Sequence, residues 1–314
     1  MTRVGAIDCG TNSIRLLVAD VDPDTVSLTD LLRRMEIVRL GHGVDKTGVI
    51  APDAMARTLA QAREYASQCS ELGVERVRFV ATSASRDARN AQEFVAGVRE
   101  AFAAFGIAPE VITGHEEASL SFRGATGDLQ AADIAGPYLV VDIGGGSTEF
   151  VRGTGDVEQS LSVDVGCVRI TERHLRSDPP THSQIAEATA DIEAAIDRAA
   201  EVVDFKGISA LVGLAGSVTT ITAHALRQPT YNADEIHLSQ LPAAEMIDTC
   251  TSLLSMSRAE RAALGFMHPG RVDVIGAGAL IWRTIIQRLQ RDVGITRVVT
   301  SEHDILDGIA LSIA

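Results

Sequence analysis

The sequence predicts an α/β protein with two similar domains. A motif of apolar strand, aspartate, glycine-containing polar turn, hydroxyl residue and apolar strand occurs twice, around Asp8 and around Asp142. The spacing of the two copies leaves room for one α/β domain between them, and 314 residues with 46% hydrophobic side chains are ample for two cores. We therefore expect domains at residues 1–124 and 125–314, with the last helix as a candidate to pack back on the first domain.

The second copy of the motif is predicted to bind phosphate. It reads YLVVDIGGGSTEFVR over residues 138–152, the pattern of a strand, a tight glycine turn and a returning strand. Glycines let consecutive backbone N–H groups converge on one anion. Asp142 and Glu149 flank this turn, and carboxylates would repel a phosphate unless a cation lay between them, so the motif indicates bound Mg²⁺. The alternative is a glycine hairpin whose acids are merely solvated.

The first copy of the motif has the same order of features. Residues 4–7 form the expected strand, residues 8–13 the turn and residues 14–19 the returning strand. An internal repeat of this kind indicates two similar domains that each offer one phosphate-binding hairpin. We expect the two hairpins to contribute Asp8 and Asp142 to one shared cleft.

Hydrophobic periodicity and turn residues predict the remaining elements. Further strands are expected within residues 25–39 and at 77–81, 110–112, 161–163, 209–213 and 297–300. Helices are expected at 52–72, 91–105, 114–124, 185–203, 241–255, 257–264 and 304–314, with a shorter one starting at 171–175. Residues 127–136 are expected to be a loop or a short helical connector. Open α/β sheets of this kind hold ligands at the carboxyl ends of their strands.

The two hairpins resemble the paired phosphate loops of the actin, sugar kinase and Hsp70 superfamily. Within it, four motifs together resemble the exopolyphosphatase / guanosine pentaphosphate phosphohydrolase family. They are DCGTNS at 8–13, ATSASRDARN at 81–90, GHEEA at 114–118 and DIGGGSTE at 142–149. The similarity continues through residues 165–172, 213–217, 268–278 and 301–308, so it covers almost the whole chain.

The resemblance implies two ribonuclease H-like (actin-like ATPase) domains with a cleft between them, and a Mg²⁺ cofactor with Mn²⁺ as a substitute. It singles out Glu117 as the residue that activates the attacking water, while Glu116 is left as an acid that caps the helix start. Arg86 is expected to grip a phosphate, with a surface ion pair as the alternative, and Asn90 to line the cleft.

The candidate residues fall into three groups. The metal ligands are Asp8, Asp142 and Glu149, and the catalytic residues are Glu117, Asp142 and Glu149. The phosphate ligands are Thr11, Asn12, Ser13, Arg86, Asn90, Gly144, Gly145, Gly146, Ser147, Thr148, Gly216 and Ser217.

For two further glycine turns, close packing is the alternative to ligand binding. The turn at Gly216 and Ser217 follows a strand and precedes a hydroxyl-rich helix start, so it is predicted either to bind further phosphates or only to pack closely. For Gly276 and Gly278 we favour close helix packing over contact with a nucleotide base.

Composition excludes several classes of function. The net charge of −14 argues against general binding of nucleic acid or of anionic membranes, and no apolar run approaches the roughly 20 residues of a membrane span. With no secretory leader recognised at the N-terminus, the protein is expected in the cytoplasm, with a homodimer as a candidate assembly.

The scattered positions of the four cysteines argue against a cysteine zinc site or a disulfide framework. One of them, Cys9, lies in the first phosphate turn.

The preferred function is hydrolysis of terminal phosphates from inorganic polyphosphate with release of orthophosphate. Hydrolysis of guanosine pentaphosphate (pppGpp) is the close alternative, because the family that the chain resembles performs both. An ATP-dependent kinase for a sugar or acetate, and a nucleotide-sensing module without catalysis, are the other classes considered. Many members of that family carry additional C-terminal helical domains, so we expect this shorter form to prefer shorter polymers.

Overall fold

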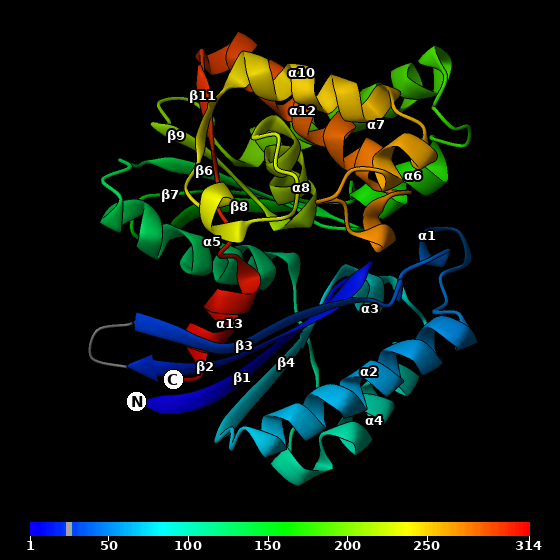
Figure 1. Ribbon diagram of the computed structural model, residues 1–314, viewed down its shortest axis with the longest axis vertical. Coiled ribbons are helices and arrows are strands. Elements are labelled where there is room, and N and C mark those ends of the chain that lie inside the picture. The colour runs from blue at the N-terminus through cyan, green and yellow to red at the C-terminus, as the bar shows by residue number, and fades with distance from the viewer. Residues whose placement is uncertain (23–26) are drawn as a thin grey trace. The chain divides into compact units, whose positions relative to one another are not determined.

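The structure, a computed structural model, describes residues 1–22 and 27–314 (Figure 1). The chain divides into two compact units, one made of residues 1–124 and 305–314 and the other of residues 125–304. The division after Gly124 is where the domain boundary was expected. Residues 305–314, which hold the last helix, group with the first unit, the packing that the sequence analysis gave as a candidate.

The first unit contains a five-stranded sheet in the order β3-β2-β1-β4-β5. Its strands are β1 Thr2–Cys9, β2 Ser13–Asp22, β3 Ser27–Ile37, β4 Arg76–Ala81 and β5 Glu110–Val111. The first three pair antiparallel, whereas β4 runs parallel to both β1 and β5. Of the segment expected to hold the third strand, residues 25 and 26 lie outside the described residues.

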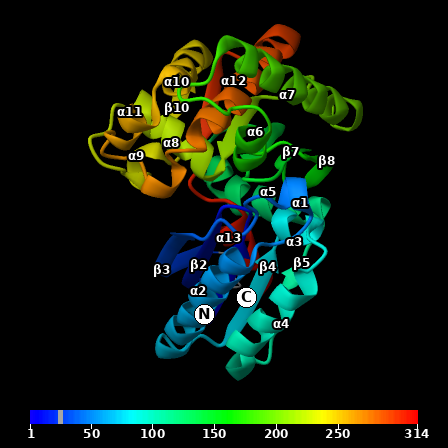
Figure 2. The same ribbon diagram turned by 90° about the vertical axis from the view of Figure 1, so that its right-hand side faces the viewer.

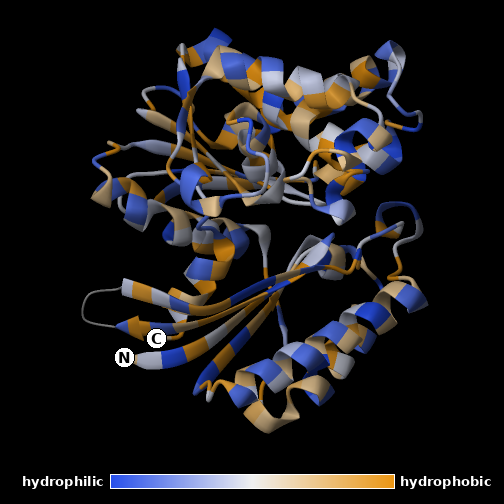
Figure 3. Cartoon of the chain, viewed as in Figure 1, coloured by the Kyte–Doolittle hydropathy of each residue, from blue (hydrophilic) through white to orange (hydrophobic). Residues whose placement is uncertain are grey.

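Helices cover both faces of this sheet. They are α1 Val44–Thr47, α2 Pro52–Glu71, α3 Ser83–Asp87, α4 Ala91–Ala101, the 3₁₀ turn Ala103–Phe105, the start of α5 Gly114–Ala131, and α13 Ile305–Ser312. Side chains of β2 alternate between faces, so Leu16 packs under α2 and α4 while Leu17 packs under α13. Figure 2 shows α2 and α4 side by side, and α2 alternates hydrophilic and hydrophobic residues in Figure 3.

The second unit repeats the topology of the first. Its sheet has the order β10-β11-β9-β6-β7-β8. The strands are β6 Tyr138–Ile143, β7 Thr148–Gly153, β8 Val157–Val163, β9 Ala210–Leu214, β10 Gln240–Pro242 and β11 Arg297–Thr300. From β8 inward, three antiparallel strands are followed by two parallel ones, the same arrangement as in the first unit. This shared arrangement is that of ribonuclease H-like domains and confirms the predicted fold class.

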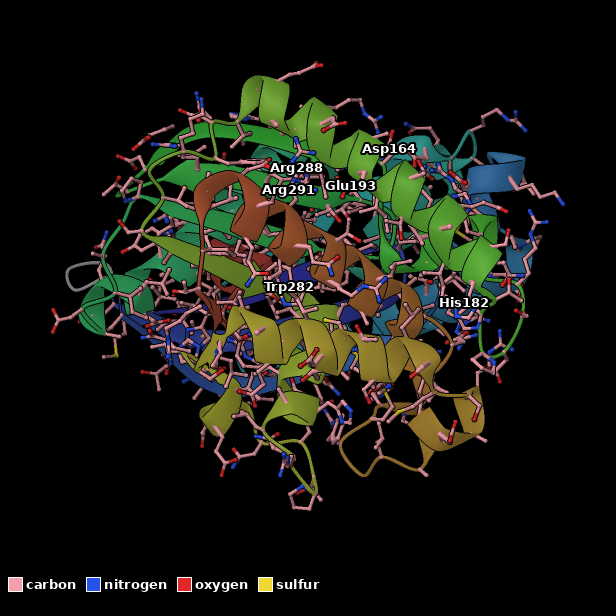
Figure 4. All side chains as sticks on the ribbon, turned by 90° about the horizontal axis from the view of Figure 1, so that it is seen from above. Asp164, His182, Glu193, Trp282, Arg288 and Arg291 are labelled. Carbon is pink, nitrogen blue, oxygen red and sulfur yellow. The ribbon has the colours of Figure 1, made fainter. Side chains whose placement is uncertain are left out.

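The helices of the second unit surround one large apolar core. They are α6 Cys167–Arg173, α7 His182–Val202, α8 Ala215–Ala225, α9 Ala233–Ile236, α10 Ala243–Ser255, α11 Arg258–Ala262, the 3₁₀ turn Pro269–Arg271, and α12 Ile275–Val293. Trp282 of α12 is fully buried in this core. At the surface, Arg288 of α12 binds Glu193 of α7 at 3.3 Å, and Figure 4 shows the two side chains together.

Three element predictions are corrected. The helix expected to end near Gly124 continues to Ala131, because Ala125 and Leu129 are fully buried and extend its apolar face. Residues 240–242 form an edge strand before α10, so the helix begins at Ala243 rather than at residue 241. Helix α6 starts at Cys167 rather than at 171–175. Among the described residues, none of the helices has the length and apolarity needed to span a membrane.

Candidate functional site

The two predicted hairpins have the same backbone geometry. In the first unit the amide of Gly10 donates to the carbonyl oxygen of Ser13 at 2.9 Å, and in the second the amide of Gly144 donates to that of Ser147 at 3.0 Å. Asp8 and Asp142 are each the last residue but one of the strand before the turn. The predicted repeat is therefore a repeat of structure, residue by residue.

The residue opposite the aspartate differs between the two hairpins. In the first unit Arg15 is the cross-strand partner of Asp8, and its guanidinium donates to Asp8 Oδ2 from Nη2 at 2.7 Å and from Nε at 3.0 Å. This contact offsets the charge of Asp8 within its own hairpin. Sequence analysis did not select Arg15, although it follows Asp8 at the same offset as Glu149 follows Asp142.

In the second unit two carboxylates occupy these opposed positions. Asp142 pairs with Glu149 across β6 and β7, and their exposed fractions are 6% and 1%. Glu149 also accepts a hydrogen bond from Ser162 of β8 at 2.7 Å. Like charges directly opposite each other in a sheet are unfavourable, and oxygen donors of this kind suit a hard divalent cation. The donor set therefore fits the Mg²⁺ that the sequence predicted.

The glycine turn beside these acids is held from one side by α6. The carbonyl oxygens of Gly144 and Gly145 accept from the amides of Cys167 and Val168 at 3.0 and 2.9 Å. A Cβ on Gly166 would lie 2.4 Å from the Gly145 carbonyl, so only glycine permits this approach. Within the described part of the chain, the three successive amides of residues 145–147 donate no hydrogen bond. Such a run of amides is suited to an anion.

The predicted ligand Thr148 has another role. Its hydroxyl donates to the carbonyl oxygen of Val165 at 2.6 Å, so the hydroxyl hydrogen holds β7 to the segment before α6. Ser147 is 2% exposed and lies in the turn itself. The phosphate contacts of Ser147 and Thr148 stay predictions, and in this structure the Thr148 hydroxyl also holds the turn.

The turn of the first unit is held by the segment after β3. The carbonyl oxygen of Asn12 accepts from the amides of Val38 and Arg39 at 3.0 and 2.8 Å, and that of Thr11 accepts from Gly41 at 2.9 Å. Thr11 is 7% exposed, and its Oγ1 has no hydrogen-bond partner among the described residues. A buried hydroxyl without a partner is costly, and a phosphate oxygen would satisfy it. Asn12 and Ser13 are half-buried beside it.

Glu117 and Glu116 lie in very different surroundings at the start of α5. Glu116 is 43% exposed in its side chain and pairs with Arg78 at 2.5 Å. Glu117 is buried and accepts from Arg86 Nη1 at 2.7 Å. Burial raises the pKa of Glu117, the charge of Asp8 adds to this, and Arg86 and the Thr82 hydroxyl oppose it. A buried carboxyl with a raised pKa is suited to accept a proton near neutral pH.

Arg86 and Asn90 are both engaged within the fold. Arg86 Nη1 donates to Glu117 and to the carbonyl oxygen of Ile112 at 3.0 Å, so in this structure it orients the carboxylate. The Asn90 side chain accepts from the amide of Ile50 at 2.9 Å and donates to its carbonyl oxygen at 3.0 Å. Both hydrogen-bonding groups of Asn90 therefore hold the loop before α2, and its predicted phosphate contact stays a prediction.

The remaining glycine turns are filled by side chains. Arg271 Nη1 donates to the Gly216 carbonyl oxygen at 3.1 Å, and a Cβ on Gly216 would lie 2.1 Å from Arg271 Nη2. A Cβ on Gly278 would lie 2.5 Å from Ser217 Oγ, and one on Gly276 would lie 2.6 Å from Arg261 Nη2. The structure shows close packing at both turns. Close packing was one of the two alternatives for Gly216 and Ser217, and it was the favoured alternative for Gly276 and Gly278.

Cys9 is excluded as a reactive thiol. It is 1% exposed, and burial, with the charge of Asp8, raises its pKa well above the ordinary thiol value. All four cysteines are buried and free of disulfides.

Two ribonuclease H-like units, each carrying an acid-tipped glycine hairpin, define an α/β protein with a repeated fold. The sequence matches the Ppx/GppA phosphatase family over residues 17–313, and the chain belongs to that family. It is 49% identical over 318 residues to Exopolyphosphatase 2 of Mycobacterium tuberculosis, covering 100% of this chain and 99% of the relative.

Solved structures agree with this assignment. An exopolyphosphatase-like protein matches with a TM-score of 0.94 at 43% identity, over 99% of this chain and 97% of its own. The Ppx/GppA protein of Aquifex aeolicus matches with a TM-score of 0.81 at 29% identity, over the same shares. An exopolyphosphatase from Cytophaga hutchinsonii matches with a TM-score of 0.85 at 25% identity, over 98% and 96%. The predictions of the family and of the hydrolase class are thereby confirmed.

Proposed function

We propose that the protein is an exopolyphosphatase that removes the terminal phosphate of inorganic polyphosphate and releases orthophosphate. The observation that carries this proposal is the buried pair of Asp142 and Glu149 beside a turn with unengaged amides. A divalent cation held by the carboxylates and an anion held by the amides would stabilise each other. The 49% identity to a relative named exopolyphosphatase supports the choice of substrate.

Asp142 and Glu149 are proposed as ligands of Mg²⁺, with Mn²⁺ as a substitute. When bound, the ion neutralises charge on the phosphate oxygens and makes the phosphorus easier to attack. Asp8 is proposed as a further oxygen ligand of lesser effect, because Arg15 already offsets its charge. The amides of residues 145–147 and the buried hydroxyl of Thr11 are proposed to bind phosphate oxygens.

Glu117 is proposed as the general base. Its carboxylate takes a proton from water as the water oxygen forms a bond to the terminal phosphorus. The bond from that phosphorus to the bridging oxygen breaks, and the leaving chain retains the electron pair. Arg86 and Thr82 hold the carboxylate in place. The raised pKa makes Glu117 a stronger base than an ordinary glutamate.

Guanosine pentaphosphate remains the second candidate substrate, because it offers the same terminal phosphoanhydride bond. The packing of Arg261 against Gly276 favours polyphosphate, since this side chain fills a place considered for contact with a nucleotide base. An ATP-dependent kinase is disfavoured by Glu117, whose buried carboxylate suits activation of water.

A phosphate-release panel tests the proposal. Polyphosphates of several lengths, guanosine pentaphosphate and ATP are each incubated with the protein and Mg²⁺, with no other acceptor. We expect orthophosphate from polyphosphate at the highest kcat/KM. Release of orthophosphate from guanosine pentaphosphate alone would show that this nucleotide, and not polyphosphate, is the substrate. A requirement for a second acceptor would overturn the hydrolase assignment.

A further inference from the structure

A cluster of three metal-binding side chains lies in the second unit, formed by residues other than the proposed Mg²⁺ ligands. Asp128 belongs to α5, His237 follows α9, and His303 precedes α13. Each offers one ligand atom, and the three atoms lie within 4.8 Å of one another. Asp128 Oδ2 is 2.5 Å from His303 Nδ1 and 3.6 Å from His237 Nε2.

The segments that carry the two histidines are held by the fold. The amide of His303 donates to the hydroxyl of Ser301, which is fully buried and donates back to the His303 carbonyl oxygen at 2.8 Å. Leu238, next to His237, donates its amide to Thr300 of β11 at 2.8 Å and has a φ of +57°. A non-glycine residue in the left-handed region persists only where its surroundings fix it. Binding would therefore require little reorganisation of the backbone.

The position of the cluster leaves it open to water. The side chains of His237, His303 and Asp128 are 22%, 38% and 39% exposed. The two imidazole rings have centroids 4.5 Å apart, so two protonated rings here would repel each other. Two neutral imidazoles and one carboxylate are a common ligand set for zinc.

We propose that Asp128, His237 and His303 bind a divalent ion of the zinc class, with water in the fourth position. The ligand types separate this site from the proposed Mg²⁺ site, because Mg²⁺ favours oxygen ligands and zinc accepts imidazole nitrogen. When the ion binds Nε2 of neutral His237, the ring proton moves to Nδ1, which gives up its long, 3.3 Å contact with the Glu302 amide. Protonation of either ring removes a ligand atom, so binding weakens as the pH falls.

The location of the ligands in the chain gives the ion a defined structural effect. Asp128 follows Gly124 closely and His303 shortly precedes Ile305, and at these two places the chain passes between the units. A bound ion would cross-link both linking segments inside the second unit. It would therefore stabilise that unit against thermal unfolding.

Equilibrium dialysis of the full chain against Zn²⁺ in excess Mg²⁺, with elemental analysis, tests the proposal. We expect one Zn²⁺ per chain, a rise in Tm with Zn²⁺, and a loss of affinity exceeding about 100-fold in His303→Ala, because even outer residues of metal sites cost about 10–100-fold. If His303→Ala does not fold, Asp128→Asn is used in its place, because it keeps the side-chain shape. The same loss of Zn²⁺ affinity is expected for it.

His174→Ala is the matched control. His174 also pairs with an aspartate, Asp191, at 3.0 Å, but it is not part of a three-ligand cluster. Its replacement should leave Zn²⁺ binding unchanged. The proposal is overturned if the chain retains no Zn²⁺, if His303→Ala and Asp128→Asn bind it like the unaltered protein, or if His174→Ala loses it equally. None of these readouts depends on phosphatase activity.

Discussion

Glu149 lies directly opposite Asp142 on the neighbouring strand, and both carboxylates are buried. The equivalent position in the first unit holds Arg15, which neutralises Asp8. The first hairpin thus places a guanidinium opposite its aspartate, whereas the second places a carboxylate there, beside a turn suited to an anion. This asymmetry is the physical reason for assigning the main cation site to the second unit.

The proposed base can be tested by Glu117→Gln. A general base contributes about 10²–10⁴-fold, so kcat should fall by at least that order. The net environment raises the pKa of Glu117, which means that the fold favours the neutral carboxyl. The stability that neutral Glu117 contributes is fully present below the pKa that this residue has in the unfolded chain. It is lost as the pH rises through the pKa of Glu117 in the folded protein. At neutral pH the variant should therefore have a Tm no lower than the unaltered protein. Full activity in Glu117→Gln would remove this residue from the mechanism.

The two roles considered for Arg86 are separated by the pH dependence of Arg86→Met. The guanidinium lowers the pKa of Glu117, so its loss should move the acid limb of the kcat/KM profile to higher pH. In the unaltered protein this limb should already lie above the ordinary pKa of glutamate. A large rise in KM with an unmoved acid limb would instead show that Arg86 binds the substrate, as first expected from the sequence.

The last helix is predicted to position Glu117. A Cβ on Gly308 of α13 would lie 2.0 Å from the backbone oxygen of Leu120, one turn after Glu117 in α5. Arg123 of α5 also donates to the Leu311 carbonyl oxygen at 3.0 Å. Gly308→Ala must therefore separate the two helices, and a displacement of about 1 Å can cost about 10²-fold in rate. We expect kcat to fall while KM stays nearly unchanged. We also expect the acid limb of the kcat/KM profile against pH to shift.

Ile309→Ala is the control for the previous variant. Ile309 is fully buried on the same helix, and its truncation costs about 2–5 kcal/mol of stability without adding an atom between α13 and α5. Its folded fraction should keep its kcat. Equal losses of kcat in the two variants, or none in Gly308→Ala, would show that the contact with Leu120 is only structural.

The sequence allowed the hairpins and their acids to be predicted because both depend on local chemistry. A strand, a glycine turn and a flanking carboxylate are visible in consecutive residues, and the same order occurs twice. The distinction between Glu116 and Glu117 came from the resemblance to a family. The structure gives this distinction a physical reason, because Glu117 is buried and Glu116 is exposed. That difference in burial depends on α3 and β4 and could not be inferred from the local sequence.

Contacts between distant segments could not be predicted from the sequence. Thr148 and Asn90 were assigned to phosphate because their types and positions suit it, yet Val165 and Ile50 use their hydrogen bonds. Residues 305–314 join the first unit through the pairing of Asp307 with Arg33 on β3 and the packing of Gly308 on α5. No periodicity in the final helix indicates which sheet it covers.

Calorimetric titration with Mg²⁺ in the absence of substrate tests the central claim most directly. The attraction between an ion and a carboxylate at about 4 Å is worth about 4 kcal/mol per charge pair at an effective dielectric of about 20. Asp142→Asn and Glu149→Gln should therefore each weaken Mg²⁺ binding by at least about 10²-fold, and Asp8→Asn by less. Binding of equal strength in all four proteins would contradict the assignment of the cation to the opposed carboxylates.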